Sequence, residues 1–198
     1  MSLNNGCKRV EKTAANQGVR SLESIVDDFN REFKDRVDEE LDHYKGEKSF
    51  FDVIGQASWF ENCDGRKHPH QHRIKTIAIR DLSVALSDFD EAALQKLVSF
   101  DELHDFIKRE AGCIPGIGEL AVYDTATRIG SYLGLYPKYV YLHCGTREGA
   151  QNILGRRLTE PYLPKSDFPE ELNDLSPDQI ENLLCIFKRQ LDKVDRKV

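Results

Sequence analysis

A glycine-rich turn between two helical segments constrains the fold more than any other part of this sequence. It lies in the stretch AGCIPGIGELAVYDTATRIGSYLG, residues 111–134. A charged amphipathic segment precedes the turn, and a helical pattern rich in small residues follows it. Gly116 and Gly118 permit backbone angles and a close approach that a side chain would block. The sequence therefore predicts two helices that pack closely across a tight corner.

This turn resembles the helix-hairpin-helix motif, in which an apolar-Pro-Gly-apolar-Gly turn joins two packed helices. The resemblance implies sequence-independent contact with the backbone of one DNA strand, made by N–H groups at the turn and at the helix start. Glu119 departs from it, because a carboxylate there suits the helix dipole but opposes a phosphate. A helix-capping corner without a ligand therefore remains the alternative. The matched residues are Ile114, Pro115, Gly116, Ile117 and Gly118, then Ala121 or Val122, Ala126 and Ile129 on the inner face of the second helix.

A helix-hairpin-helix motif within an all-α chain is similar to the DNA glycosylase superfamily. In that family a catalytic lysine, when present, lies two residues after the second glycine, and a catalytic aspartate opens the segment after the second helix. This chain has Leu120 at the first position, and the second region offers His143 and no aspartate. Leucine cannot form a Schiff base. The resemblance thus implies the scaffold, but not base excision by the usual lysine and aspartate mechanism.

The whole pattern predicts an all-α fold of about eight helices. We expect an orthogonal bundle around the helix-hairpin-helix motif, with a C-terminal helix packed on it. Residues 1–20 lack periodicity and are expected to be disordered, and residues 21–198 are expected to form one domain. Within this domain the hairpin occupies 100–134, and the C-terminal connector and helix occupy 159–198.

Individual helices can be placed from periodicity and from their caps. Apolar residues recur every three or four positions from Ile25 to Tyr44, which predicts a helix. Pro69 suits the first position of another helix, which we expect to run to about Leu86. The run KYVYL is the one segment whose helix or strand character stays ambiguous.

Composition bounds the classes of function. The net charge is −6 over 198 residues, which argues against a general nucleic-acid binder unless positive charge is concentrated locally. Two segments concentrate it: residues 61–80 hold five basic and two acidic residues, and residues 125–158 hold five basic and one acidic.

Neither a membrane span nor a signal sequence is evident, so we expect a cytoplasmic protein. The five cysteines form no C-x-x-C pair, and we expect reduced, mostly buried thiols and no cofactor.

The first basic segment, GRKHPHQHR, supplies Arg66, Lys67 and Arg73 as candidate phosphate-binding residues. His68 and His72 would lie one turn apart on a helix, which makes them weak candidates for a metal site. The adjacent Arg66 and Lys67 would repel a cation, so we expect no metal. A solvated basic turn is the alternative for this segment.

The second basic segment supplies Arg147, Arg156 and Arg157 as further phosphate-binding candidates.

Three hypotheses follow for the protein as a whole. The first is binding of DNA or another phosphate-bearing ligand, at Gly116, Ile117, Gly118 and the basic residues, without glycosylase catalysis. The second is an enzyme that acts on a small or nucleotide substrate with a pocket of His143, Asp124 and Tyr123. The third is a protein-interaction module that uses the N-terminal and C-terminal helices.

Overall fold

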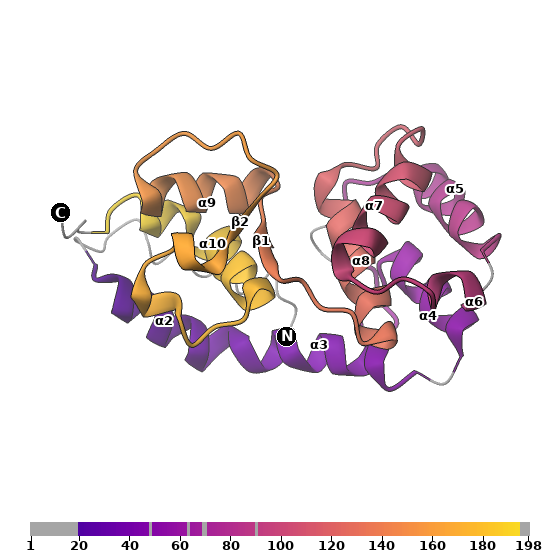
Figure 1. Ribbon diagram of the computed structural model, residues 1–198, viewed down its shortest axis with the longest axis horizontal. Coiled ribbons are helices and arrows are strands. Elements are labelled where there is room, and N and C mark those ends of the chain that lie inside the picture. The colour runs from indigo at the N-terminus through magenta and orange to yellow at the C-terminus, as the bar shows by residue number, and fades with distance from the viewer. Residues whose placement is uncertain (1–19, 48, 63, 69–70, 90, 195–198) are drawn as a thin grey trace. The chain divides into compact units, whose positions relative to one another are not determined.

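The computed structural model describes residues 20–47, 49–62, 64–68, 71–89 and 91–194 (Figure 1). Its elements are α2 (Leu22–Phe29), η2 (Asn30–Lys34), α3 (Asp35–Lys45), α4 (Phe50–Trp59), α5 (Thr76–Ser87), α6 (Glu91–Leu94), α7 (Phe100–Ala111), α8 (Glu119–Leu133), β1 (Tyr139–Tyr141), α9 (Cys144–Leu154), β2 (Tyr162–Pro164), η4 (Lys165–Asp167), η5 (Glu170–Leu172) and α10 (Pro177–Leu191). The predicted all-α class is confirmed, with one pair of short strands as the exception. If α2 and α3, which the π turn η2 joins, are counted once, the described residues form eight α-helices. Apart from Arg20, the predicted disordered segment 1–20 lies outside the described residues.

The chain divides into two compact units. Unit 1 comprises residues 1–37 and 138–198, and unit 2 comprises residues 38–137. The first boundary falls within α3. The single domain predicted over 21–198 stays a prediction, because a division into compact units does not test whether they unfold together.

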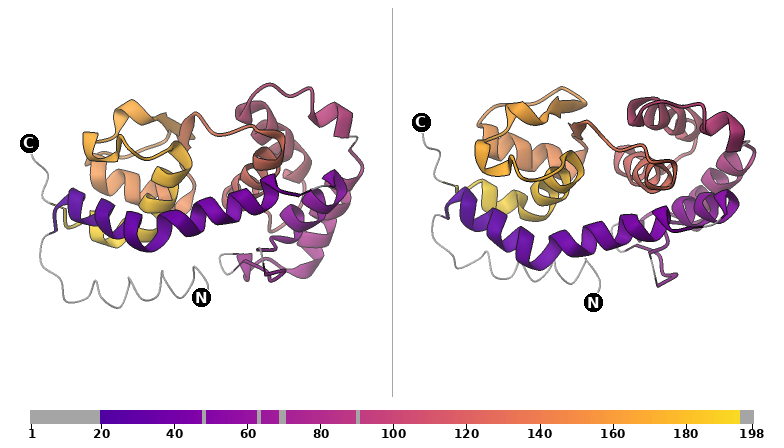
Figure 2. Two further views of the ribbon diagram at one scale, coloured as in Figure 1. Left: turned by 90° about the horizontal axis from the view of Figure 1, so that it is seen from below. Right: turned by 60° about the horizontal axis from the view of Figure 1, so that its bottom comes forward.

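Helix α10 is the central helix of unit 1. It contacts α9, α2 and β1, and Figures 1 and 2 show it, in yellow, between α2 and α9. Its apolar residues Ile180, Leu183 and Phe187 are buried in the core of the unit. The helix begins with a capping box, in which Ser176 and Gln179 each accept the other's backbone N–H. The cap and the apolar stripe together explain why the predicted C-terminal helix forms.

Helices α9 and α10 approach unusually closely at Gly149. A Cβ atom at this position would lie 2.8 Å from the carbonyl carbon of Leu184 and closer still to its oxygen. One turn earlier, a Cβ atom at Gly145 would lie 2.8 Å from the Sγ atom of Cys185. The two glycines therefore let the backbone of α9 pack directly on α10.

The ambiguous run KYVYL forms a strand. In β1 and β2, which pair antiparallel, Val140 lies opposite Leu163. Both of these residues are buried in the core of unit 1, next to Leu142 and Leu158. Each strand has only three residues, which is too short for an alternating pattern to be visible in the sequence.

Four helices of unit 2 pack in a closed ring. The neighbouring pairs are α4 with α5, α5 with α7, α7 with α8, and α8 with α4. Ser49 and Ser99 cap α4 and α7 by accepting the backbone N–H groups of Asp52 and Glu102. The predicted orthogonal crossing of the helices stays a prediction.

The helix predicted to start at Pro69 starts later. Residues 69 and 70 lie outside the described part, residues 72–75 are not helical, and α5 begins at Thr76. The segment before α5 is held as a turn instead: the backbone N–H of His68 donates to Phe60 (2.6 Å), and the Nζ atom of Lys67 donates to Ile74 (2.8 Å). These contacts tie down the described residues on both sides of 69–70, ahead of the observed start of α5.

The expectation of mostly buried thiols is wrong for the described cysteines. Cys113 and Cys144 are exposed, and Cys185 is partly buried. Cys113 belongs to the turn between α7 and α8, and Cys144 is the first residue of α9. Both exposed residues therefore lie where elements begin or end, outside the cores.

Candidate functional site

The turn between α7 and α8 has the geometry of a type II β-turn. The backbone N–H of Ile117 donates to the carbonyl of Ile114 (3.2 Å), which closes the turn around Pro115 and Gly116. Proline suits the second position of such a turn, and the third position requires a positive φ. Gly116 has a φ of +98°. Only glycine adopts this angle without strain, so the local backbone explains the Pro-Gly pair.

The start of α8 leaves backbone donors without partners inside the helix. Gly118 is the N-cap residue, and no side chain caps the helix. The first N–H that bonds within α8 belongs to Val122, which donates to Gly118 (3.1 Å). The N–H groups before it have no acceptor within a helix. Gly116 and Gly118 are both exposed, so a ligand can approach this end of α8.

The first turn of α5 lies beside this glycine turn. A Cβ atom at Gly116 would lie 3.8 Å from the Cβ atom of Ala78, the third residue of α5. The N-cap of α5 is Lys75; no side chain caps this helix either, and its first turn holds no acidic residue. Two helix N-termini, each with a partial positive charge, therefore flank the turn.

Basic side chains lie close to these N-termini in sequence. Arg73 and Lys75, which immediately precede α5, are exposed, and neither forms an ion pair within the described residues. Lys108 and Arg109 are in the last turn of α7, where Arg109 pairs with Glu110 (3.0 Å). Together with the exposed glycines, these groups make the hairpin the best candidate anion site of unit 2.

The other predicted residues of the first basic segment are placed differently. Arg66 is exposed, and Lys67 is held by its bond to Ile74. His68 is buried and lies 3.2 Å from Glu40, whereas His72 is exposed and contacts the carbonyl of Lys67 (3.0 Å). The two weak metal candidates thus have separate partners. No three His, Cys, Asp or Glu side chains are placed to hold a metal ion in the part of the chain that is described.

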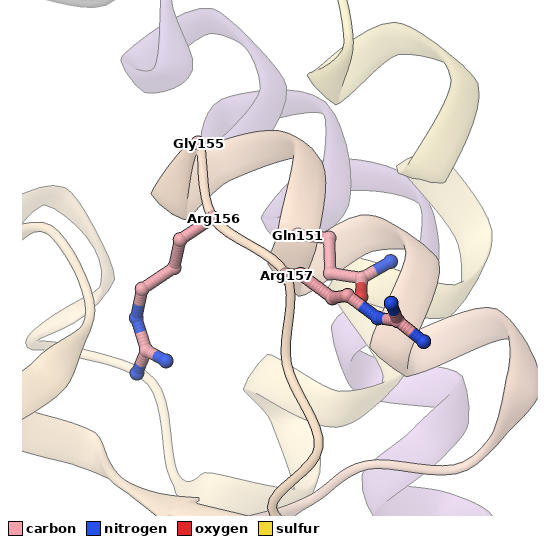
Figure 3. A pocket seen from close by; sticks show the side chains of 4 residues that line it. All are labelled: Gln151, Gly155, Arg156 and Arg157. Atoms are coloured by element: carbon pink, nitrogen blue, oxygen red, sulfur yellow. The ribbon is translucent and has the colours of Figure 1, made fainter.

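The three candidate residues of the second basic segment, Arg147, Arg156 and Arg157, lie in unit 1. Arg147 donates to the carbonyls of Leu142 (2.5 Å) and Glu160 (2.7 Å), and more weakly to a third. Arg156 pairs with Glu160 (2.9 Å). Arg156 and Arg157 line a shallow hollow of about 400 Å³ with Gln151 and Gly155. Figure 3 shows the two guanidinium groups pointing away from each other, so they do not form one clamp.

The residues of the proposed enzyme pocket have different neighbours. His143, in unit 1, is buried; its Nε2 atom lies 2.5 Å from Glu181, which also accepts the hydroxyl of Thr146 (2.7 Å). In unit 2, Asp124 accepts a hydrogen bond from the side chain of Gln71. Tyr123 is buried too, with its ring 6.0 Å from that of Phe100. A pocket that combines these three residues stays a hypothesis.

Among the described residues, the helices invoked for a protein-interaction module, α2, α3 and α10, carry no large exposed apolar side chain. The exposed large apolar side chains of the described residues lie elsewhere. They are Phe51, Trp59, Ile77, Val84, Val98, Tyr136 and Tyr162, none of which belongs to α2, α3 or α10.

Sequence reasoning missed a buried charged cluster in unit 2. Arg128 is 3% exposed, and its guanidinium donates to Glu40 (Nη2, 3.0 Å), the same carboxylate that His68 contacts. The Nη1 atom of Arg128 has no hydrogen-bond partner among the described residues. Its guanidinium also lies over the rings of Tyr44 (5.9 Å) and Phe60 (5.8 Å). The spacing of Arg128 in the sequence could have revealed this cluster. Arg128 lies two helical turns after Ala121 and therefore on the inner face of α8.

Electrostatics couple the members of this cluster. Burial alone would raise the pKa of Glu40, but the hydrogen bond from His68 and the charge of Arg128 lower it to about 2. Burial alone would lower the pKa of Arg128, and the charge of Glu40 outweighs this and raises it. Both groups are therefore charged at neutral pH, and each depends on the other.

No family model, curated protein or solved structure matches this chain. Within the described ranges, no helix has the length and apolar character needed to cross a membrane.

Proposed function

We propose that unit 2 binds the backbone of nucleic acid through the hairpin formed by α7, the turn 112–118 and α8. The observation that supports this most is the meeting of two uncapped helix N-termini, those of α5 and α8, at an exposed glycine turn. Helix N-termini bind phosphate because their free N–H groups and their dipoles both favour negative charge. The helix-hairpin-helix resemblance points to the same ligand.

Each group has a distinct part in this proposal. The N–H groups at Gly118 and in the first turn of α8 donate to one phosphate, while Arg73 and Lys75 neutralise its neighbours. Contacts of this kind read no base, so binding is independent of sequence. Glycosylase catalysis is not part of the proposal, because Leu120 stands where the family's lysine would.

A salt titration tests the proposal directly. The full chain is titrated with labelled duplex and single-stranded DNA by fluorescence anisotropy at a series of salt concentrations. A protein that neutralises two or three phosphates of duplex DNA shows a slope of about −2 to −3 in log K against log salt. An absence of binding to both DNAs at low salt would overturn the proposal.

Substitution of Gly118 by alanine should weaken DNA binding without unfolding the protein. Gly118 has an ordinary φ of −109°, and a Cβ atom there would meet no atom within 4 Å, so the fold tolerates the methyl group. A phosphate bonded to the adjacent N–H groups would be pushed away, and we expect about tenfold weaker binding, the loss of one charge-assisted hydrogen bond. The matched control is Gly55→Ala in α4, where a Cβ atom also meets nothing within 4 Å. Equal affinity of Gly118→Ala and Gly55→Ala would count against the hairpin.

Removal of the charge at Glu119 should strengthen DNA binding. This carboxylate lies in the first turn of α8, where it repels the proposed phosphate. We expect Glu119→Gln to bind about two- to fivefold more tightly at low salt, with the gain lost at high salt. Glu23 occupies the first turn of α2 in the same way, so Glu23→Gln is the matched control. A uniform gain from both substitutions would indicate net charge rather than the hairpin.

A further inference from the structure

The short sheet of unit 1 has two different faces. Its strands pair Tyr139 with Pro164, Val140 with Leu163 and Tyr141 with Tyr162. Side chains alternate between the faces of a strand, so the buried residues of the central pair occupy one face. The three tyrosines occupy the other face. This outer face is the feature of unit 1 that neither the core nor the proposed hairpin site explains.

The three tyrosine rings lie against one another, and one pair of them is stacked. The rings of Tyr139 and Tyr162 have centroids 4.8 Å apart and planes only 25° from parallel. The ring of Tyr141 lies 5.6 Å from that of Tyr162 at a tilt of 48°. Despite these two contacts, Tyr162 remains 41% exposed. Tyr162 therefore presents aromatic surface to solvent, next to the partly buried ring of Tyr139 and the ring of Tyr141, which is only 6% exposed.

Positive charge lies at both ends of β1. Lys138, which immediately precedes Tyr139, is exposed. At the other end, the guanidinium of Arg147 lies 2.5 Å from the carbonyl of Leu142, the residue after Tyr141. Its other bonds are to the backbone carbonyls of residues 158 and 160. No carboxylate among the described residues pairs with Lys138 or Arg147, so neither charge is neutralised by an acidic side chain.

We propose that this tyrosine face binds unpaired bases of single-stranded nucleic acid, with Lys138 and Arg147 attracting the flanking phosphates. Aromatic side chains bind single strands because every base offers a π face, and nearby cations follow the backbone. Bases within a duplex are already stacked on each other, so the face selects single strands. The inference uses only residues of unit 1 and does not depend on the hairpin of unit 2.

The test compares the full-length protein with Tyr162→Leu, which keeps an apolar side chain in the strand but removes the ring. The probe is a labelled oligothymidylate of roughly ten nucleotides, followed by fluorescence anisotropy. We expect about tenfold weaker binding for Tyr162→Leu and near-normal binding for Tyr162→Phe, which keeps the ring. Tyr136→Leu is the matched control, since Tyr136 is also exposed (47%) but lies outside the sheet. Thermal unfolding of each variant shows whether the fold is kept.

A second variant tests the same proposal if Tyr162→Leu does not fold. Lys138→Gln changes an exposed side chain without an ion pair in the described residues, so the fold should not depend on it. We expect weaker binding of the single strand and a salt slope reduced by about 0.7. The proposal is overturned if the wild-type protein does not bind the oligothymidylate, or if Tyr162→Leu and Tyr136→Leu bind it equally well. Failure of the hairpin proposal would appear separately, as equal duplex binding by Gly118→Ala and Gly55→Ala.

Discussion

Replacement of Glu40 by alanine is expected to destabilise unit 2 by about 3 to 5 kcal/mol. The substitution leaves Arg128 charged and buried, without the carboxylate that compensates it. His68 loses its acidic partner at the same time. The measurement is urea unfolding followed by the fluorescence of Trp59, the only tryptophan of the chain and a residue of unit 2.

Two further variants separate the buried pair from general effects on α3. Glu39→Ala removes the neighbouring, exposed carboxylate and should change stability by less than about 0.5 kcal/mol. The double variant Glu40→Ala with Arg128→Met removes both charges of the pair and should recover much of the loss, because no unpaired ion remains. A Glu40→Ala protein as stable as Glu39→Ala would contradict the role assigned to this cluster.

The same cluster predicts how stability depends on acid. The pKa of Glu40 is lowered in the folded state to about 2, from its ordinary value of 4.5. Because its pKa is lowered on folding, the contribution of Glu40 to the free energy of unfolding is complete above about pH 4.5. This contribution is lost as the pH falls toward 2. The difference between the two pKa values of Glu40 corresponds to about 3 kcal/mol of folding stability. In Glu40→Gln this part of the acid dependence should be absent, which unfolding midpoints measured between pH 2 and pH 6 would show.

Substitution of Gly149 by alanine should destabilise unit 1 by about 3 kcal/mol or more. The added Cβ atom would collide with the backbone of Leu184, and backbone atoms within a packed helix cannot move aside without separating α9 from α10. Because Trp59 belongs to unit 2, unfolding of unit 1 is followed by far-UV circular dichroism or by hydrogen exchange in α9 and α10.

Two other glycines provide graded controls for this prediction. Gly145→Ala would meet the thiol of Cys185, a side chain that can rotate away, and we expect a loss of only about 1 kcal/mol. Gly55→Ala adds a methyl group in open space within α4 and should stabilise the helix by up to about 1 kcal/mol. A Gly149→Ala protein no less stable than Gly145→Ala would show that α9 and α10 pack less closely than described.

Several parts of the fold could be predicted because they depend on local chemistry. The helix starts at Ser49 and Ser176 and the stripe of α2 follow from caps and periodicity within single segments. The turn at Gly116 is local in the same sense, since a Pro-Gly pair satisfies a type II turn wherever it occurs. The start of α5 could not be placed in this way, because contacts of His68 and Lys67 hold the preceding residues in a turn.

The candidate sites likewise differ in whether they depend on local sequence or on tertiary contacts. The sequence by itself determined the all-α class and the glycine turn, since each depends on residues that are close together in the chain. Only the tertiary structure brought α5 to that turn, paired Arg128 with Glu40 across 88 positions, and set Tyr162 against Tyr139. Periodicity identifies the inner face of a helix, but it carries no distance to residues of another segment. That is why the glycine turn between two helices was visible in the sequence and the buried cluster and the tyrosine face were not.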